Sequence, residues 1–131
     1  MACVGPPKGT LDDRLLNYLE GYSRSIHDYE SIFVLMEYGD VNTNQEFALF
    51  LEDYIHQENS LMIIIAEGRR VDIAAFASEE HLLFDFENNL ADAYVVNNSC
   101  VILLEQGKVD TLVKIKKHSL QNTLKYLEGN L

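Results

Sequence analysis

The sequence predicts an α+β domain in which a largely antiparallel sheet of about five or six strands packs with about three helices. Three observations predict this class. Apolar residues recur at helical spacing near both ends of the chain and again around residue 50, and residues 61–115 contain short apolar runs separated by turn residues. The chain has 131 residues, which is enough for one hydrophobic core and too few for two.

The first predicted helix follows a short lead-in. Residues 1–9 contain both prolines and two of the seven glycines, so we expect a flexible segment there and a single domain over residues 10–131. Thr10 is a suitable N-cap, and Asp12 and Asp13 place negative charge in the first turn, where the helix dipole favours it. The apolar side of this helix contains Leu11, Leu15, Leu16, Tyr18, Leu19, Tyr22 and Ile26.

The next two predicted elements are a strand and a helix. The apolar run at residues 32–36 is short enough for a strand. Thr43 and Glu46 have the spacing of a capping box, which predicts a helix that ends near residue 59. The apolar face of this helix is expected to be the main core contact and contains Phe47, Phe50, Leu51, Tyr54 and Ile55.

The rest of the chain up to residue 115 is typical of strands. Residues 61–66 and 71–76 flank Glu67-Gly68-Arg69-Arg70, which predicts a hairpin. The other strand candidates are residues 81–86, 93–96, 100–104 and 109–115. Ser119 is the expected cap of a last helix, with Leu120, Leu124 and Leu127 in line.

The chain is strongly acidic. Twenty-one acids oppose ten bases, so the net charge is −11, and residues 1–66 alone carry −8. A field of this sign repels phosphate, which excludes nucleic acid as an expected direct partner, and it suits a basic protein. Four acids flank the strand predicted at residues 32–36 and are the candidate partner-binding residues: Asp28, Glu30, Glu37 and Asp40.

The sequence gives no signal for a membrane, metal or cofactor site. No apolar run approaches the roughly 18 residues of a membrane helix, and the N-terminus lacks the apolar core of a signal peptide. We therefore expect an intracellular protein, in the cytoplasm or the nucleus, with Cys3 and Cys100 as free thiols. The cysteines and histidines lack zinc-ligand spacing, and no glycine-rich phosphate loop is present, so we expect neither a metal nor a cofactor.

Four features occur in an order that is typical of one protein family. They are an early Leu-Asp before a helix and Gly-Tyr, a helix leading into a very apolar strand, a strand that ends in Phe-Asp, and an apolar strand before a Leu-rich terminal helix. In this sequence they are Leu11-Asp12 to Gly21-Tyr22, residues 46–56 with 61–65, Leu83-Phe84-Asp85, and residues 101–104 with Leu124-Lys125-Tyr126-Leu127. From about Gly5 to its end, the chain resembles the core of the herpesvirus tegument-type ubiquitin-specific cysteine protease domain.

The resemblance also implies which catalytic residues have changed. The family's strand ends in Phe-Asp-Ser-His, whose Asp and His belong to the catalytic triad; Asp85 keeps the acid, whereas Phe86 and Glu87 replace the Ser and the His. The family's nucleophilic Cys lies on a helix before the Leu-Asp pair, where this sequence has only Cys3 in the predicted lead-in. His81 is four residues from Asp85, about 13 Å along a regular strand and out of reach. Asp85 and Glu87 are therefore expected to form a vestigial site without catalytic residues.

Three functions follow as hypotheses. The resemblance implies a non-catalytic protein-binding module on a degenerate cysteine-protease-like scaffold, viral in origin, that acts on a host protein such as ubiquitin, a ubiquitin-like protein or a signalling factor. Size, acidity and element order also fit a small acidic inhibitor, immunity protein or secretion chaperone that covers a basic surface of its partner, for which binding would depend steeply on salt. The third hypothesis, an active thiol hydrolase, requires a cysteine of low pKa.

Overall fold

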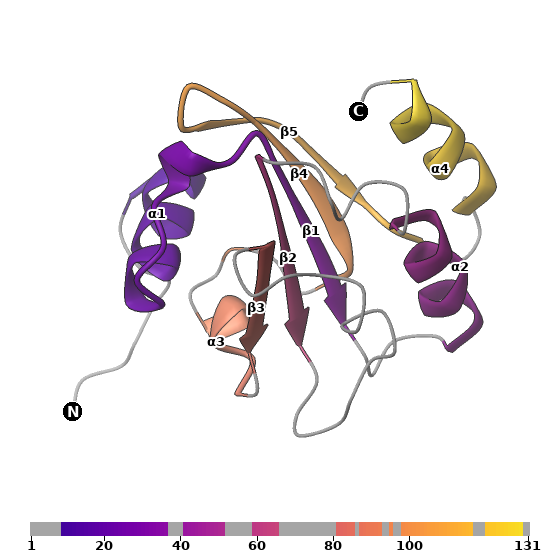
Figure 1. Ribbon diagram of the computed structural model, residues 1–131, viewed down its shortest axis with the longest axis horizontal. Helices are drawn as coiled ribbons and strands as arrows, with labels where there is room; N and C mark the ends of the chain where they lie inside the picture. Colours follow the sequence, from indigo (N-terminus) through magenta and orange to yellow (C-terminus); the bar gives the residue numbers. More distant parts are fainter. Residues whose placement is uncertain are drawn as a thin grey trace.

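A five-stranded mixed sheet forms the centre of the domain (Figure 1). The computed structural model describes residues 9–36, 41–51, 59–65, 81–85, 87–92, 95, 98–116 and 120–129. The strand order is β3-β2-β1-β4-β5, and the strands are β1 (Ser31–Met36), β2 (Ser60–Ile65), β3 (Leu82–Asp85), β4 (Cys100–Glu105) and β5 (Lys108–Lys114). β1 and β2 pair in parallel, as do β2 and β3, whereas β4 is antiparallel to both β1 and β5.

Helices cover both faces of this sheet, which confirms the predicted α+β class. Figure 1 shows α1 (Leu11–Gly21) and α3 (Asn89–Asp92) on one side, and α2 (Val41–Leu51) and α4 (Leu120–Glu128) on the other. A single 3₁₀ turn, Ile26–Asp28, follows α1 among the described residues. The sequence predicts about three helices, and the short helix α3 is the additional one in the structure.

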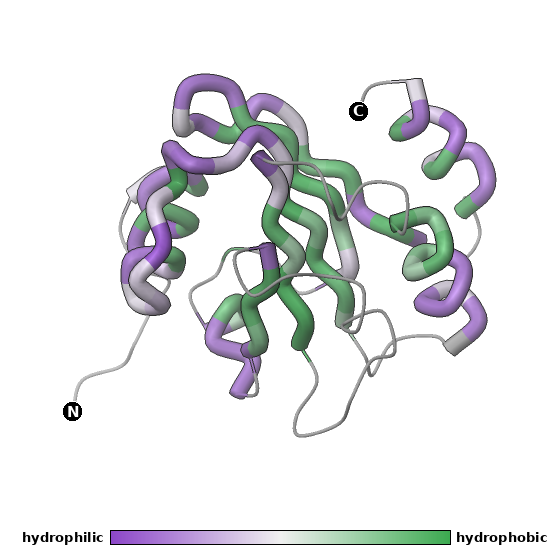
Figure 2. Tube along the Cα trace, in the orientation of Figure 1, coloured by the Kyte–Doolittle hydropathy of each residue, from purple (hydrophilic) through white to green (hydrophobic). Residues whose placement is uncertain are grey.

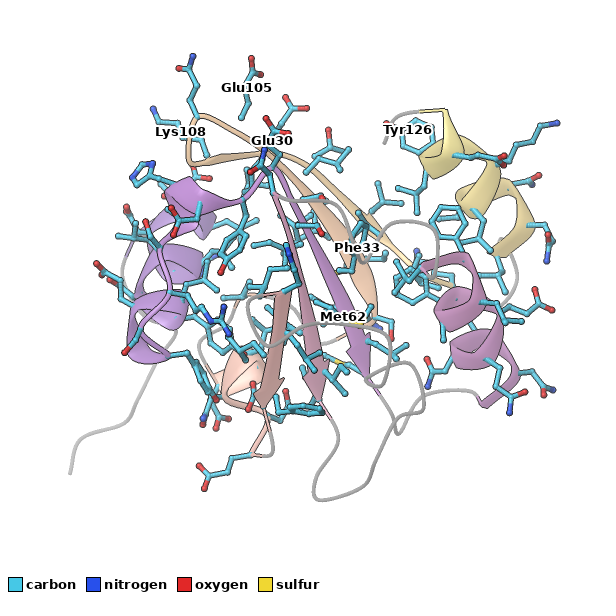
Figure 3. All side chains as sticks on the ribbon, viewed as in Figure 1. Glu30, Phe33, Met62, Glu105, Lys108 and Tyr126 are labelled. Carbon is cyan, nitrogen blue, oxygen red and sulfur yellow. The ribbon has the colours of Figure 1, made fainter. Side chains whose placement is uncertain are left out.

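The alternation of side chains along β1 separates two hydrophobic clusters. Ile32, Val34 and Met36 pack with α1, whereas Phe33 and Leu35 pack with α2 and α4. Figure 2 shows the sheet as the most hydrophobic part of the described chain, and Figure 3 shows Phe33 and Met62 on the side of α2. β1 and β2 are buried along their whole length, on both faces of the sheet. Their sequences therefore do not alternate between apolar and polar residues, as those of half-exposed strands do.

The sheet differs from the predicted one on the side of β2. The predicted hairpin joins residues 61–66 to residues 71–76, which lie outside the described residues. The described partners of β2 are β1 on one edge and β3 on the other, and both pair with it in parallel, so no antiparallel partner of β2 is found among the described residues. The expectation of antiparallel pairing holds for the half of the sheet formed by β1, β4 and β5. The candidate strand at residues 93–96 is not part of the described sheet, and its one described residue, Val95, is a bend.

The helix caps also differ between the two halves of the chain. Thr10 forms a full capping box with Asp13, whose backbone N–H donates to Thr10 Oγ1 at 3.2 Å while its carboxylate accepts from Thr10 N. By contrast, α2 begins at Val41, so Thr43 is buried inside the first turn instead of capping it. On α2, Phe47 and Leu51 are fully buried but Phe50 is only partly buried; Tyr54 and Ile55 lie outside the described residues.

A two-residue turn joins β4 to β5. Gln106 and Gly107 have φ values of 52° and 78°, as in the hairpin turns whose twist matches that of the strands. A Cβ atom at Gly107 would lie 2.4 Å from His27 Nδ1, so the turn requires glycine both for its conformation and for this close approach. Near the same turn, Asp12 accepts a hydrogen bond of 2.6 Å from Val109 N, which connects α1 to β5.

Candidate functional site

The buried carboxylate of Asp85 lies at the carboxyl end of β3. Its side chain is fully buried and accepts four hydrogen bonds. The donors are Tyr18 Oη at 2.9 Å and Leu90 N at 2.9 Å to Oδ2, and Tyr22 Oη at 3.2 Å and Asn89 N at 2.9 Å to Oδ1. Asp85 therefore connects three elements, because its donors belong to α1 and to the first turn of α3.

Two tyrosines supply the side of the site that comes from α1. Tyr18 and Tyr22 are four residues apart, so they lie on one face of the helix and its C-cap. Their ring centroids are 5.2 Å apart and the rings are tilted by 51°. Both hydroxyl groups donate to Asp85, and Tyr22 Oη also accepts from Asn89 Nδ2 at 2.9 Å. These hydrogen bonds fix the positions of both rings.

The pKa values of the two tyrosines reflect this environment. Burial, together with the charge of Asp85 and the hydrogen bond to it, raises the pKa of Tyr18 far above its ordinary value. Burial also raises the pKa of Tyr22; the hydrogen bond from Asn89 acts in the opposite direction, and the charges of Asp85 and Glu87 add to the increase. Both phenols are therefore neutral donors at physiological pH.

An open cleft lies over this cluster, with a volume of about 620 Å³. We call it the α1–β3 cleft, because its walls come from the end of α1 and from the segment that joins β3 to α3. Figure 1 shows α3 beside the end of β3, on the side of the sheet that carries α1. The described residues that line the cleft are Asn17, Tyr18, Gly21, Tyr22, Phe84, Glu87 and Asn89.

The structure brings together the two residues of the predicted vestigial site. Asp85 is buried beneath the tyrosines, and Glu87 is exposed at the cleft. His81 precedes β3 at the opposite end of the strand, where its Nδ1 is 3.0 Å from the carbonyl oxygen of Ser60. The expected separation of His81 from Asp85 is therefore present.

The two cysteines cannot both be placed. Cys3 lies outside the described residues. Cys100 is a free cysteine that is fully buried in β4, and burial raises the pKa of its thiol to about 12. At neutral pH this thiol is therefore protonated.

The four candidate partner-binding acids are placed only in part. Asp28 and Glu30 are exposed before the amino end of β1, and Figure 3 shows Glu30 near Glu105 and Lys108. The backbone of Glu30 accepts a hydrogen bond of 2.8 Å from Leu104 N, which fixes its place beside β4. Glu37 and Asp40 lie outside the described residues, so a shared surface of the four acids stays a prediction.

The described part of the chain has neither a candidate metal site nor a candidate membrane span. No group of three or more His, Cys, Asp or Glu side chains there is arranged to hold a metal ion. No helix there is long and apolar enough to cross a membrane.

Sequence reasoning missed Tyr18, Tyr22 and Asn89 as members of the site. The helical spacing of the sequence places both tyrosines on the apolar side of the first helix. It does not show that the Tyr18 hydroxyl donates to the carboxylate of Asp85, which is 67 residues away in the chain. Asn88 has a φ of 56°, and the turn at this residue leads into α3, whose first amide groups donate to Asp85.

Comparisons of this chain with protein-family models, with curated proteins and with solved structures gave no match. The fold and the site define an α+β domain with an open, acidic and aromatic cleft.

The site predicts a pH-dependent effect of Tyr18. At about pH 8, Tyr18→Phe is expected to lower the free energy of unfolding by about 1–3 kcal/mol, because a hydrogen bond to a buried carboxylate is lost. In the unfolded chain Tyr18 loses its proton near its ordinary pKa of 10.0, whereas the folded protein holds that proton to higher pH. Above this pH the unfolded chain binds fewer protons, so the stability of the unmodified protein falls by up to about 1.4 kcal/mol per pH unit.

The phenylalanine variant has no proton to lose at this position. The difference in stability between the two proteins is therefore expected to shrink as the pH rises from about 10 to about 11. Denaturant unfolding of both proteins across this range measures it, and effects of other alkaline groups such as Cys100 cancel in the difference. A difference that stays constant with pH would contradict the assigned environment of Tyr18.

Proposed function

We propose that this chain is a non-catalytic protein-binding module on a scaffold that resembles a cysteine-protease core. The observation that supports this most directly is the hydrogen bonding of Asp85. In a catalytic triad the carboxylate accepts a hydrogen bond from an imidazole and orients it. Here tyrosine hydroxyls and backbone amides donate to both carboxylate oxygens, so the group is used to hold α1 and α3 on β3.

Two further residues support the absence of thiol chemistry. Glu87 stands where the resemblance implies an imidazole, and a carboxylate raises the pKa of a neighbouring thiol instead of lowering it. Cys100 is buried in a central part of the sheet, and burial raises the pKa of its thiol to about 12. A nucleophilic cysteine requires the opposite environment, in which the thiolate is stabilised and exposed.

The proposed partner is a protein inside the cell, in the cytoplasm or the nucleus. The resemblance suggests ubiquitin, a ubiquitin-like protein or a signalling factor of the host of a virus. The net charge of −11 suits a partner with a basic surface. The same charge supports the second candidate, an acidic inhibitor, immunity protein or chaperone, whose affinity would fall steeply as salt is raised and whose partner would be basic as a whole.

The experiment combines an activity assay with a binding assay on the full chain. We expect no hydrolysis of a fluorogenic ubiquitin substrate and no labelling by a ubiquitin-based cysteine probe, and Glu87→His is expected to restore neither. Stoichiometric labelling that is abolished by Cys3→Ser or Cys100→Ser would contradict the proposal. A titration of ¹⁵N-labelled protein with ubiquitin at low and at high salt then tests the first suggested partner and the charge dependence of its binding.

A further inference from the structure

We propose that the α1–β3 cleft is a binding site for the cationic end of a lysine or arginine side chain presented by a protein partner. This inference rests on the proposed function, because it names the feature of the partner that the module would recognise. It follows from the chemistry of the residues that line the cleft, from the way two of its rings are held, and from the space at Gly21.

Among the described residues, the lining of the cleft combines aromatic rings with a carboxylate and contains no basic side chain. Tyr18, Tyr22 and Phe84 provide the aromatic part, and Glu87 provides the negative charge. A cation is attracted both by the face of an aromatic ring and by a carboxylate. An anionic ligand such as a phosphate would be repelled by both, so the lining selects for positive charge.

The tyrosine rings are positioned before any ligand binds. Both hydroxyls donate to the buried carboxylate of Asp85, and Asn89 holds Tyr22 from a second direction. Rings that are already fixed lose little conformational entropy on binding. When a phenol hydroxyl donates a hydrogen bond to a carboxylate, the electron density of its ring increases. This increase strengthens the attraction of the ring for a cation. Asp85 thus acts through the tyrosines, as a positioning residue.

Glu87 is the group that would pair with the bound cation. Its side chain is exposed, and among the described residues no ion pair to it is present. Its charge contributes to the raised pKa of Tyr22, so the carboxylate and the Tyr22 hydroxyl are electrostatically coupled. A cation in the cleft would therefore interact with Glu87 and with the tyrosine rings together.

Gly21 leaves room for the aliphatic stem of such a side chain. A Cβ atom built at this position meets no atom within 4 Å, although Gly21 lines the cleft. Because α1 ends at Gly21, a larger residue there is compatible with the fold and would project toward the open space. This position therefore offers a way to fill the cleft without altering Asp85 or the tyrosines.

The test is a titration of the ¹⁵N-labelled full chain with three blocked tripeptides, in which glycine flanks lysine, arginine or norleucine. Norleucine keeps the aliphatic stem of lysine but lacks the charge. We expect the lysine and arginine peptides to shift the backbone signals of Asn17, Gly21 and Glu87, and the norleucine peptide to bind at least about tenfold more weakly.

Two variants and a matched control locate the binding. Glu87→Gln is expected to weaken binding of the cationic peptides by about threefold to tenfold, and Gly21→Leu is expected to abolish it. Glu128→Gln removes the same charge from an exposed residue of α4, on the opposite face of the sheet, and is expected to leave the affinity unchanged. Thermal unfolding of each variant verifies that it is folded.

Three results would overturn the inference. They are an absence of signal shifts with both cationic peptides, equal binding of the norleucine peptide, and equal losses for Glu87→Gln and Glu128→Gln. These results are separate from the activity assay. Hydrolase activity would refute the proposed function whatever the peptides do, whereas failure of the peptides to bind an inactive protein refutes only the assignment of the cleft.

Discussion

Replacing Asp85 with alanine is expected to lower the free energy of unfolding by about 3–5 kcal/mol. The side chain is fully buried, and its removal leaves two tyrosine hydroxyls and two backbone amides without an acceptor. Each buried donor that loses its partner costs about 1–3 kcal/mol, less where water from the cleft can replace the carboxylate. Denaturant unfolding monitored by circular dichroism measures this change.

Asp85→Asn removes the negative charge and one of the two acceptor oxygens but leaves the size of the side chain nearly unchanged. Both carboxylate oxygens accept from a backbone amide of α3, so the NH₂ group of asparagine must face either Asn89 N or Leu90 N, which cannot reverse their roles. We expect a loss of about 2–3 kcal/mol even though the shape is unchanged.

Asp92→Asn is the matched control, because it makes the same change at an exposed residue of α3. It is expected to change the stability by less than about 0.5 kcal/mol. If Asp85→Asn were as mild as Asp92→Asn, the hydrogen-bonded cluster at the end of β3 would not be a major source of stability.

Only some features of the site around Asp85 can be recognised from neighbouring residues in the sequence. The end of a short apolar strand is visible in the sequence, and so is the spacing of Tyr18 and Tyr22 on a helix. Their meeting depends on which edge of the sheet β3 occupies, and that in turn depends on the parallel pairing of β3 with β2. Non-local pairing of this kind leaves no periodic signal, so the cluster was not predicted from the chain alone.

The parallel half of the sheet did leave a signal of another kind. Residues 32–36 and 61–65 are continuous apolar runs without polar alternation, which is typical of strands that are buried on both faces. Such strands are common in parallel pairs connected by a helix, and α2 lies between β1 and β2 in the chain. The turn-like Glu67-Gly68-Arg69-Arg70 favours a hairpin instead, but these residues lie outside the described ones.

The core contact of α2 was predicted in its general position but not in its detail. The capping-box pattern at Thr43 places the start of the helix three residues late, and it assigns five apolar residues to one buried face. In the structure Phe47 and Leu51, which are four residues apart, define the buried line, whereas Phe50 lies to its side and is only partly buried. The sequence pattern is compatible with either residue as the centre, because both belong to a broad apolar stripe.

Phe47→Ala is therefore expected to destabilise the protein more than Phe50→Ala does. Phe47 is fully buried against Phe33, Leu35 and the other residues of the cluster between the sheet, α2 and α4. Removing a buried phenylalanine side chain costs about 3–5 kcal/mol, because apolar contacts are lost and a cavity remains. Phe50→Ala is expected to cost less, since part of its ring is already in contact with water.

Leu49→Ala gives the matched control on the same helix. Its side chain is 64% exposed, so the truncation removes few contacts and is expected to change the stability by less than about 0.5 kcal/mol. Chemical denaturation of the three variants under one set of conditions tests the order Phe47, then Phe50, then Leu49. If Phe50→Ala were the most destabilising, the face of α2 that packs on β1 would be rotated relative to the one described.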